Sequence, residues 1–536
     1  MNSNFMYSRS ARAPNQRPRA MVWETVEPNK DSNQIKVTKR GNQDRESNQR
    51  TCICCLLILI TLLVSALYVA LLLIFRKHSC AMFTTTNNEV NISLQTQTKH
   101  NEVNLSLQTQ TTHIPISAQQ RTIGSRGKAF VVLFMKYGYD ATKNIYITSE
   151  NGVQMNITTS PRLEASLKSI TEKHRNIPSS QRIIIPHDME LQSFRIEYKA
   201  ILIKTSSDVF VISHDDGDRS VGSTTHIPLH KLSTKYIVIT SIPILNSTSQ
   251  LAVSAIKDNT LISIRFKMKQ NLPLHINGKT FYNGDVFKFS LNRFESYQIE
   301  HITDLTGTFV ESSAEIAVFS GNDCNRLKDI GGCDHLIEQL PPTECVDKIY
   351  LVPPNSDDRE TIIRIIAIEN ANISYMIGGV TQTRYLRKLD YFNTLITSNE
   401  TCYIKSQAPI MVTAFGLHSK ISKLGDPTMT IVPGINQYLN YYKIVVPSGY
   451  DHNYVSIMMK HSSKYFFRIN GTVINTTDIV FEENLSVGNA TYNVRSIRVV
   501  EGELTASTVN GERFGLMFAG VTYYEAYGFS GNSMLP

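Results

Sequence analysis

The sequence predicts an all-β fold, in which about four repeats of roughly 100 residues form tandem β-sandwich-like modules behind one transmembrane helix. Three observations support this prediction: short strand-like runs after residue 127, segments that recur along the chain, and one uncharged apolar stretch. A large β-propeller, with half of each repeat as a blade, is the alternative arrangement.

The strand prediction rests on runs of five to eight residues such as AFVVLFM, NIYITSE, VFVIS and YIVITSIP. They are rich in Val, Ile, Tyr, Phe and Thr and are bounded by Gly, Asn, Asp and Pro, which is typical of β-strands and their turns. Long helical periodicity is nearly absent, and we expect a helix only within Arg162–His174.

The repeats are recognised by a shared opening and a second shared element. The openings begin at Lys128, Lys235, Lys348 and Tyr441. The second elements begin at Ser206, Ser312, Ser406 and Glu512. A period of roughly 100 residues with several strands per repeat indicates tandem modules that together bury an ample core, so folding needs no metal or cofactor.

The apolar stretch is Cys52–Phe75, CICCLLILITLLVSALYVALLLIF, which has no charged residue. It is long enough to cross the hydrocarbon core of a bilayer of about 30 Å as a helix. It begins too far from the amino terminus for an ordinary signal peptide, which favours an uncleaved signal-anchor. Ten Lys and Arg precede it, against Arg76 and Lys77 just beyond it, and this asymmetry predicts a cytoplasmic amino terminus.

Glycosylation sequons agree with that orientation, because all of them follow the apolar stretch. The expected glycosylation sites are Asn91, Asn104, Asn156, Asn246, Asn372, Asn399, Asn470, Asn475, Asn484 and Asn489. We therefore expect a single-pass type II plasma-membrane glycoprotein whose carboxyl-terminal domain is extracellular.

Four parts follow from this topology. Residues 1–51 are expected to form a disordered basic cytoplasmic tail, and residues 52–75 the anchor. Residues 76–126 are expected to form a glycosylated low-complexity stalk, with NNEVNISLQTQTKH followed by the near copy HNEVNLSLQTQTTH. Residues 127–536 are expected to form the β ectodomain. The basic excess lies mostly beside the membrane, where anionic lipids attract it, so it does not indicate a nucleic-acid partner.

Five cysteines are expected in the oxidising compartment, where disulfides persist. Cys80, in the stalk, is the candidate for linking two chains as a homodimer. For the other four we favour Cys324–Cys333 as a local loop and Cys345–Cys402 as a longer bridge. Three pairings are possible, and spacing alone does not choose among them.

Residues Ser320–Pro342, SGNDCNRLKDIGGCDHLIEQLPP, resemble the amino-terminal domain of the IgGFc-binding protein family. The run DPTMTIVPGINQYLNYYKIVVPSG and the segment FGLMFAGVTYYEAYGF extend the resemblance over roughly 127–530. The resemblance implies that Cys324 and Cys333 are paired and that Cys402 occupies a family position, whereas Cys345 departs from the pattern. It also implies binding or adhesion, and it identifies no ligand-contact residues.

Candidate catalytic and metal motifs are weak. Cys333–Asp334–His335 would place neighbouring side chains on opposite faces of a strand, and a disulfide cysteine is not a nucleophile. His214–Asp218, HDDGD, offers oxygen ligands for Ca²⁺, but it lacks EF-hand spacing, and a solvated turn is the simpler interpretation. His187, His226 and His230 lie near it in the sequence, with no helix to bring two of them to one face.

These observations predict a cell-surface binding or adhesion glycoprotein, without enzymatic activity or a cofactor, whose ligand is an extracellular protein or glycan of immunoglobulin, mucin or microbial type. The alternatives are a structural component of a mucus or extracellular matrix and a hydrolase on a β scaffold. A hydrolase would require a pocket where a His and carboxylates converge.

Overall fold

The computed structural model describes residues 124–535, apart from 138–139, 245, 269–271 and 328–331. The predicted tail, the anchor at 52–75 and the stalk up to residue 123 lie outside the described residues. Within those residues, no helix is long and apolar enough to span a membrane.

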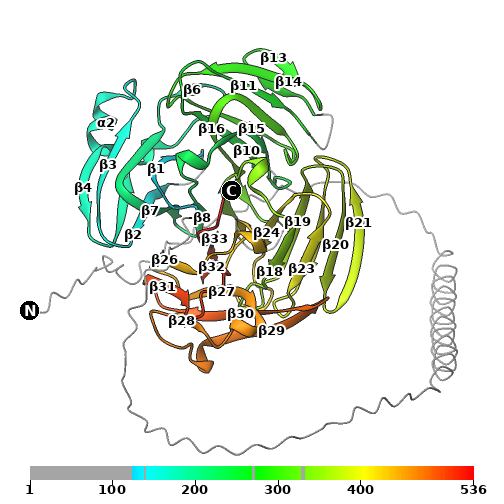
Figure 1. Ribbon diagram of the computed structural model, residues 1–536. Helices are drawn as coiled ribbons and strands as arrows, with labels where there is room; N and C mark the ends of the chain where they lie inside the picture. The colour runs from blue at the N-terminus through cyan, green and yellow to red at the C-terminus, as the bar shows by residue number, and fades with distance from the viewer. Residues whose placement is uncertain (1–123, 138–139, 245, 269–271, 328–331, 536) are drawn as a thin grey trace, which may run out of the picture. The chain divides into compact units, whose positions relative to one another are not determined.

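The described chain is all-β and antiparallel, and its strands fall into four consecutive segments (Figure 1). Segment I contains β1 (Gly127–Val132), β2 (Ala141–Ser149), β3 (Val153–Thr159), α2 (Ala165–Thr171), β4 (Lys173–Ile177), β5 (Ser180–Ile185), β7 (Ile201–Gly217) and β8 (Ser220–Thr225). Segment II contains β9 (Ser233–Ile237), β10 (Ser249–Ala255), β11 (Thr260–Arg265), β12 (Leu274–Ile276), β13 (Lys279–Phe281), β14 (Val286–Leu291), β15 (Ser296–His301), β16 (Phe309–Asn325) and β17 (Asp334–Gln339), and β6 (Ile196–Glu197) joins its sheet.

Segments III and IV contain the remaining strands, β18 to β33. Segment III contains β18 (Ile349–Val352), β19 (Thr361–Ala367), β20 (Ala371–Ile377), β21 (Val380–Leu386), β22 (Tyr391–Ile396), β23 (Cys402–Ser406), β24 (Ile410–Gly416) and β25 (Thr428–Ile431). Segment IV contains β26 (Tyr441–Val446), β27 (His452–Lys460), β28 (Phe467–Ile469), β29 (Ile479–Val487), β30 (Ala490–Val499), β31 (Gly502–Thr508), β32 (Phe514–Thr522) and β33 (Glu525–Ser530). The helix expected within Arg162–His174 is the short α2, because Lys173 onward pairs with β3 as the edge strand β4.

Segments I and II each contain one long strand, and the two halves of that strand pair with different sets of neighbouring strands. The first half of β7 pairs with β1 and β3, and its second half pairs with β2 and β8. In the same way, the first half of β16 pairs with β9 and β11, and its second half pairs with β10 and β17. The shared second element of the sequence repeat is therefore the strand that connects the two layers of each segment.

In segments III and IV, the corresponding strand is broken in two. Pro409 separates β23 from β24, because proline has no N–H for the ladder. In segment IV, the turn around Gly511, whose φ is +74°, separates β31 from β32. Segment III then has two separate sheets, β18-β23-β20-β21 and β22-β19-β24-β25, and their side chains share one apolar core. The two sheets of segment III therefore enclose one apolar core between them.

A buried aromatic residue marks the opening strand of every segment. Tyr236, Tyr350 and Tyr442 each accept a hydrogen bond from the backbone N–H three residues earlier. Each hydroxyl also donates to a backbone carbonyl at or just before the second half of the long strand, those of Ile316, Ile410 and Phe514. Segment I has the buried Phe130 in its opening strand. The repeated contact explains physically why the openings are similar in sequence.

Apolar packing continues across every junction between segments. One cluster joins segments I and II, a second joins II and III, a third joins III and IV, and a fourth joins IV back to I through residues such as Phe210 and Phe518. The four segments therefore pack as a closed series, and apolar area is removed from water at every junction.

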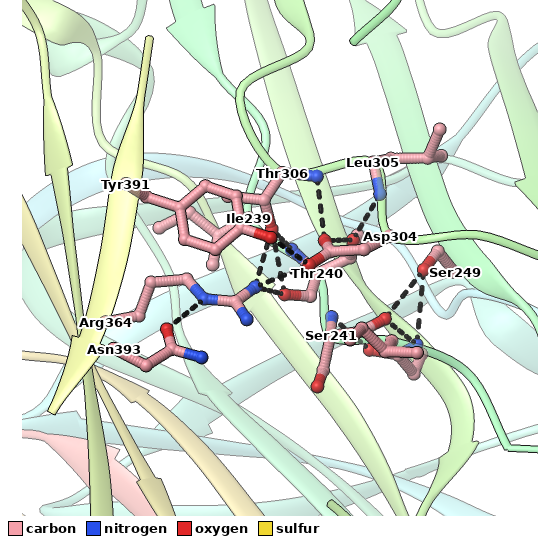
Figure 2. A network of polar contacts seen from close by, with 12 residues as sticks. Ile239, Thr240, Ser241, Ser249, Asp304, Leu305, Thr306, Arg364, Tyr391 and Asn393 are labelled. Carbon is pink, nitrogen blue, oxygen red and sulfur yellow. Dashed lines mark hydrogen bonds and ion pairs between the residues drawn. The ribbon is translucent and has the colours of Figure 1, made fainter. Parts of the chain in front are cut away.

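A buried ion pair reinforces the junction between segments II and III (Figure 2). Arg364 of β19 lies 3.1 Å from Asp304, which precedes β16, and it also donates to the Thr306 hydroxyl and to the Thr240 carbonyl. The Tyr391 hydroxyl donates to Asp304 at 2.8 Å, and the Tyr391 ring lies under the guanidinium. Burial of this pair is tolerated because each charge has hydrogen-bonding partners.

Asp304→Asn should destabilise the protein strongly, because it leaves the buried Arg364 cation without its counter-ion. The expected loss is about 3–5 kcal/mol in the free energy of unfolding, measured by denaturant titration. Glu311→Gln is the matched control, because Glu311 pairs with Lys235 at 3.7 Å with both side chains about half exposed, and such a pair contributes about 0–1 kcal/mol. Equal effects of the two substitutions would contradict this account of the junction.

Candidate functional site

The last strands of the four segments meet one another and form what we call the central joint: β8, β17, β25 and β33. β17 contacts β8 and β25, and β33 contacts the same two strands from the other side. The residues of β8 and β17 are all buried. β17 is Asp334–Gln339, so the motif that resembles the IgGFc-binding family lies at the place where all four segments meet.

Two carboxyl groups of β17 bind the neighbouring segments. Asp334 accepts hydrogen bonds from the backbone N–H of Val221 in β8 at 2.9 Å and of Ala526 in β33 at 3.1 Å. Glu338 accepts from the Thr224 hydroxyl of β8 at 2.6 Å and from the Ile431 N–H of β25 at 2.9 Å. The two side chains of one strand therefore contact all three other segments.

Gln339 completes the connection to segment I. Its side-chain oxygen accepts a hydrogen bond from the Ile227 N–H and lies 3.0 Å from the His226 ring nitrogen Nδ1. Two glycines permit the close approach of the strands. A Cβ at Gly321 would lie 1.7 Å from the Leu336 carbonyl oxygen, and one at Gly222 would lie 2.7 Å from that of His335. Neither position has room for a side chain.

Burial shifts the pKa values of the joint. Burial raises the pKa of Glu338 to about 8, and it raises that of Asp334 well above its ordinary range, with the nearby Asp426 adding to the effect. Burial also raises the pKa of Asp426 to about 6, although His418 opposes that change. Desolvation lowers the pKa of His226 to about 4, so this ring is neutral at pH 7.

A second buried group of charges lies beside the joint, in segment I. Lys143 of β2 lies 2.8 Å from Glu190 and 3.2 Å from Asp215 of β7. The other Asp215 oxygen lies 2.8 Å from Nδ1 of His335. Although burial opposes both shifts, the carboxylates raise the pKa of Lys143, and Lys143 with His335 lowers that of Asp215 to about 2.

This group corrects the interpretation of HDDGD as a solvated turn. His214 and Asp215 are buried inside β7, and only Asp218 of the motif is fully exposed. His214 lies 3.1 Å from the Ser223 hydroxyl and 3.0 Å from the Tyr450 hydroxyl. A polar run at a strand end resembles a turn in sequence, and only its partners from other segments distinguish the two. Within the described ranges, no three His, Cys, Asp or Glu side chains converge as metal ligands.

The three histidines near HDDGD in the sequence, His187, His226 and His230, do not form a cluster. His226 is buried against Gln339, while His187 and His230 lie in separate short 3₁₀ helices. Asp334 and His335 of the Cys333–Asp334–His335 motif also have separate partners, because they point to opposite faces of β17.

One of the two favoured disulfides is present. Cys324 and Cys333 are bonded, with Cα atoms 5.3 Å apart. The Cys345–Cys402 pairing is wrong, because both are free thiols in different apolar clusters. Cys402 lies in the core of segment III, and Cys345 lies where segments I and II meet. Burial raises the pKa of Cys345 to about 11, which leaves it unreactive as a nucleophile. Cys80 lies outside the described residues.

The sequon asparagines within the described ranges are all exposed at their side chains. These residues are Asn156, Asn246, Asn372, Asn399, Asn470, Asn475, Asn484 and Asn489. Four of them lie in segment IV and two in segment III, so the predicted glycans are unevenly distributed. Asn91 and Asn104 lie outside the described residues.

A surface groove of about 520 Å³ lies between segments I and II. The end of β3 with the loop after it, the strand β7, the turn between β10 and β11 and the turn between β14 and β15 line it. Its cations are Arg162, Lys204 and Arg293, all exposed, and Arg162 pairs with Glu295 at 2.7 Å. Thr158, Thr159 and Ser160 add hydroxyl groups. The sequence did not indicate this groove, because its walls come from segments far apart along the chain.

Glu338→Gln should make the protein less sensitive to alkaline pH. The ordinary pKa of Glu is 4.5, so between about pH 4.5 and about pH 8 the folded state keeps a proton that the unfolded state loses. The contribution of Glu338 to wild-type stability therefore decreases as pH rises through this window. We expect the unfolding free energy of the variant relative to wild type to increase from pH 5 to pH 8 by on the order of a few kcal/mol.

The exposed Glu344→Gln serves as the control for Glu338→Gln and should change the free energy of unfolding by less than about 1 kcal/mol, because an exposed carboxyl contributes little. Chemical denaturation at each pH measures both variants. A Glu338→Gln difference that does not change with pH would contradict the buried, protonated state of this carboxyl.

Comparison with known proteins supports the resemblance seen in the sequence. The family model described as IgGFc binding protein matches residues 222–520. The human protein named IgGFc-binding protein is 27% identical over 220 residues, which cover 40% of this chain and 4% of that protein. This chain therefore corresponds to only a small part of its curated relative.

A solved structure of a Ca²⁺-stabilised, ice-binding adhesin from an Antarctic bacterium covers 78% of this chain and 100% of the adhesin at 8% identity, with a TM-score of 0.10. That score is too low to carry any structural argument. The family model, in contrast, spans more than half of the chain, from β8 to β32, and includes the whole of β17. The chain belongs to the IgGFc-binding protein family.

Proposed function

We propose that this chain is a cell-surface binding or adhesion glycoprotein, without catalytic activity, that is anchored by residues 52–75 and recognises an extracellular protein or glycan. Membership of the IgGFc-binding protein family is the observation that carries this proposal. The name of the human relative makes the Fc part of immunoglobulin one ligand to test, beside mucin-type glycoproteins and microbial surfaces.

The central joint supports a role in which a rigid body presents a binding surface on its outside. The polar side chains of β17 are engaged by backbone and hydroxyl groups of the other segments, so the motif holds the body together and leaves ligand contact to the outer surface. When the residues of a binding surface are already fixed in place, little conformational entropy is lost as they bind a ligand. Loops and grooves on such a body are where binding residues are usually found.

Within that surface, the groove between segments I and II is the best-supported contact site. The predicted glycans are concentrated on segments III and IV, and bulky glycans restrict access to the surface around them. The groove presents Arg162, Lys204 and Arg293 with several hydroxyl groups. Two carboxylates, Asp258 and Glu295, also line it, so the cations exceed the anions by one, and this excess suits a ligand with acidic and hydroxyl groups. Asn156 is the cross-strand neighbour of Lys204, so a glycan there would border the groove.

The proposed topology predicts that the full-length protein carries N-glycans and keeps its amino terminus inside the cell. Removal of N-glycans should lower its apparent mass on a gel, and an amino-terminal epitope tag should be stained only after the cells are made permeable. A tag after Pro536 is the control and should be stained on intact cells. An amino-terminal tag detected on intact cells would overturn the orientation.

The groove predicts the outcome of a binding experiment with the full-length protein on cells, probed with Fc, sialylated or sulfated mucin-type glycoproteins, and bacteria. Arg293→Glu and Lys204→Glu should each weaken binding of the captured ligand by about tenfold, since each replaces an attractive charge with a repulsive one. Lys235→Glu, an exposed cation outside the groove lining, should change little. Capture of none of these probes would refute the proposed function, whereas capture unaffected by Arg293→Glu would exclude only the groove.

A further inference from the structure

One buried cluster contains the Lys143 ammonium and the carboxylates of Glu190 and Asp215. A simple structural ion pair would need only one of these two carboxylates. The exposed fractions of the three side chains are 0%, 6% and 2%. Phe134 and Tyr137 surround the ammonium, with ring centroids 6.0 and 5.2 Å from it. Burying an ammonium and two carboxylates costs several kcal/mol for each ion before their attraction is counted. A reaction between Lys143 and Asp215 would remove two of these charges and leave the Glu190 carboxylate, which accepts a hydrogen bond from the Tyr137 N–H.

We propose that Lys143 and Asp215 condense into an intramolecular amide bond, which covalently links β2 to β7, with Glu190 as the proton carrier. The two residues face each other directly in the antiparallel register of these strands. Nζ of Lys143 lies 3.2 Å from Oδ1 of Asp215, so the reacting groups are already in contact. Groups held this way react as if at very high concentration, with effective molarities that reach about 10⁵–10⁸ M in well-oriented cases.

The reaction begins with an ammonium and a carboxylate and needs no oxidant or other reactant. Glu190, whose Oε2 is 2.8 Å from Nζ, takes one proton from the Lys143 ammonium. Glu190 passes that proton to Oδ1 of Asp215, and the neutral Nζ then attacks Cγ of the neutral carboxyl group, so that the Nζ–Cγ bond forms. Oδ1 leaves as water when the Cγ–Oδ1 bond breaks, with one proton from Glu190 and one from Nζ. The products are one amide and one water molecule, and Glu190 is again a carboxylate.

The neighbouring groups suit these roles. His335 Nδ1 donates to Oδ2 of Asp215 at 2.8 Å, where negative charge accumulates as Nζ adds to Cγ. The His335 ring stacks on Tyr137 at 4.7 Å, which fixes its orientation. The Tyr137 backbone N–H donates to the other oxygen of Glu190 at 2.8 Å and holds the proton carrier in place. Exclusion of water from the cluster favours condensation over hydrolysis.

Peptide mapping of the full-length wild-type protein tests the proposal. After removal of N-glycans, trypsin should fail to cleave at Lys143 and should release a branched peptide of residues 137–162 joined to residues 205–219. Its mass should be the sum of the two peptides less one water. Lys136, which lies 3.1 Å from Glu300 but has 37% of its side chain exposed, is the internal control and should be cleaved normally. Cleavage at Lys143 with both peptides at their unlinked masses would overturn the proposal.

Two variants distinguish formation of the amide bond from the contribution of the buried side chains to packing. Lys143→Arg keeps the buried cation but cannot form the amide, so the branched peptide should be absent and the melting temperature lower. Glu190→Gln keeps the shape but cannot carry the proton, and the linked fraction after a short pulse of synthesis should fall by at least about tenfold. Linkage at the wild-type rate in Glu190→Gln would remove Glu190 from the mechanism. Where a variant does not fold, the wild-type map still decides.

Discussion

Two carboxyl groups on one buried strand hold the four segments in register. Asp334 binds backbone N–H groups of segments I and IV, and Glu338 binds segments I and III, from a strand that belongs to segment II. A buried carboxyl that lost these partners would face an uncompensated desolvation cost, so any separation of the segments is penalised at this point first. The carboxyls specify the arrangement, and the apolar area buried at the junctions stabilises it.

The same constraint explains several features of the sequence around it. Gly222 and Gly321 are required because a side chain at either position would collide with the backbone of β17. The Cys324–Cys333 bond closes the short loop that leads from β16 into β17. The ends of the described chain also meet, since the Ser533 N–H donates to the Ser125 hydroxyl. Residues near both ends of the described chain thus contact each other, in addition to the contacts among the central strands.

Much of the fold could be predicted from the sequence, because strand patterning and repeats are local signals. The all-β class, the positions of the four openings and the local disulfide Cys324–Cys333 follow from residues close together in the chain. The partners of β17 could not be predicted, since Val221, Ile431 and Ala526 lie roughly 90 to 190 residues away and contribute only backbone groups. The buried state of His214 and the groove at Arg293 could not be predicted either, because the residues around them are also far away along the chain. The Cys345–Cys402 pairing is wrong because the spacing of cysteines does not show that each of these two fills a separate apolar core.

Amide hydrogen exchange of Asp334→Asn tests most directly whether β17 holds strands of the other segments. The substitution keeps the size of the side chain but replaces one acceptor oxygen with a donor, so one of the two backbone N–H groups loses its partner. We expect faster exchange in β8, β17 and β33 together, with the exchange of the distant edge strand β21 unchanged. Faster exchange confined to β17, with β8 and β33 at their wild-type rates, would contradict it.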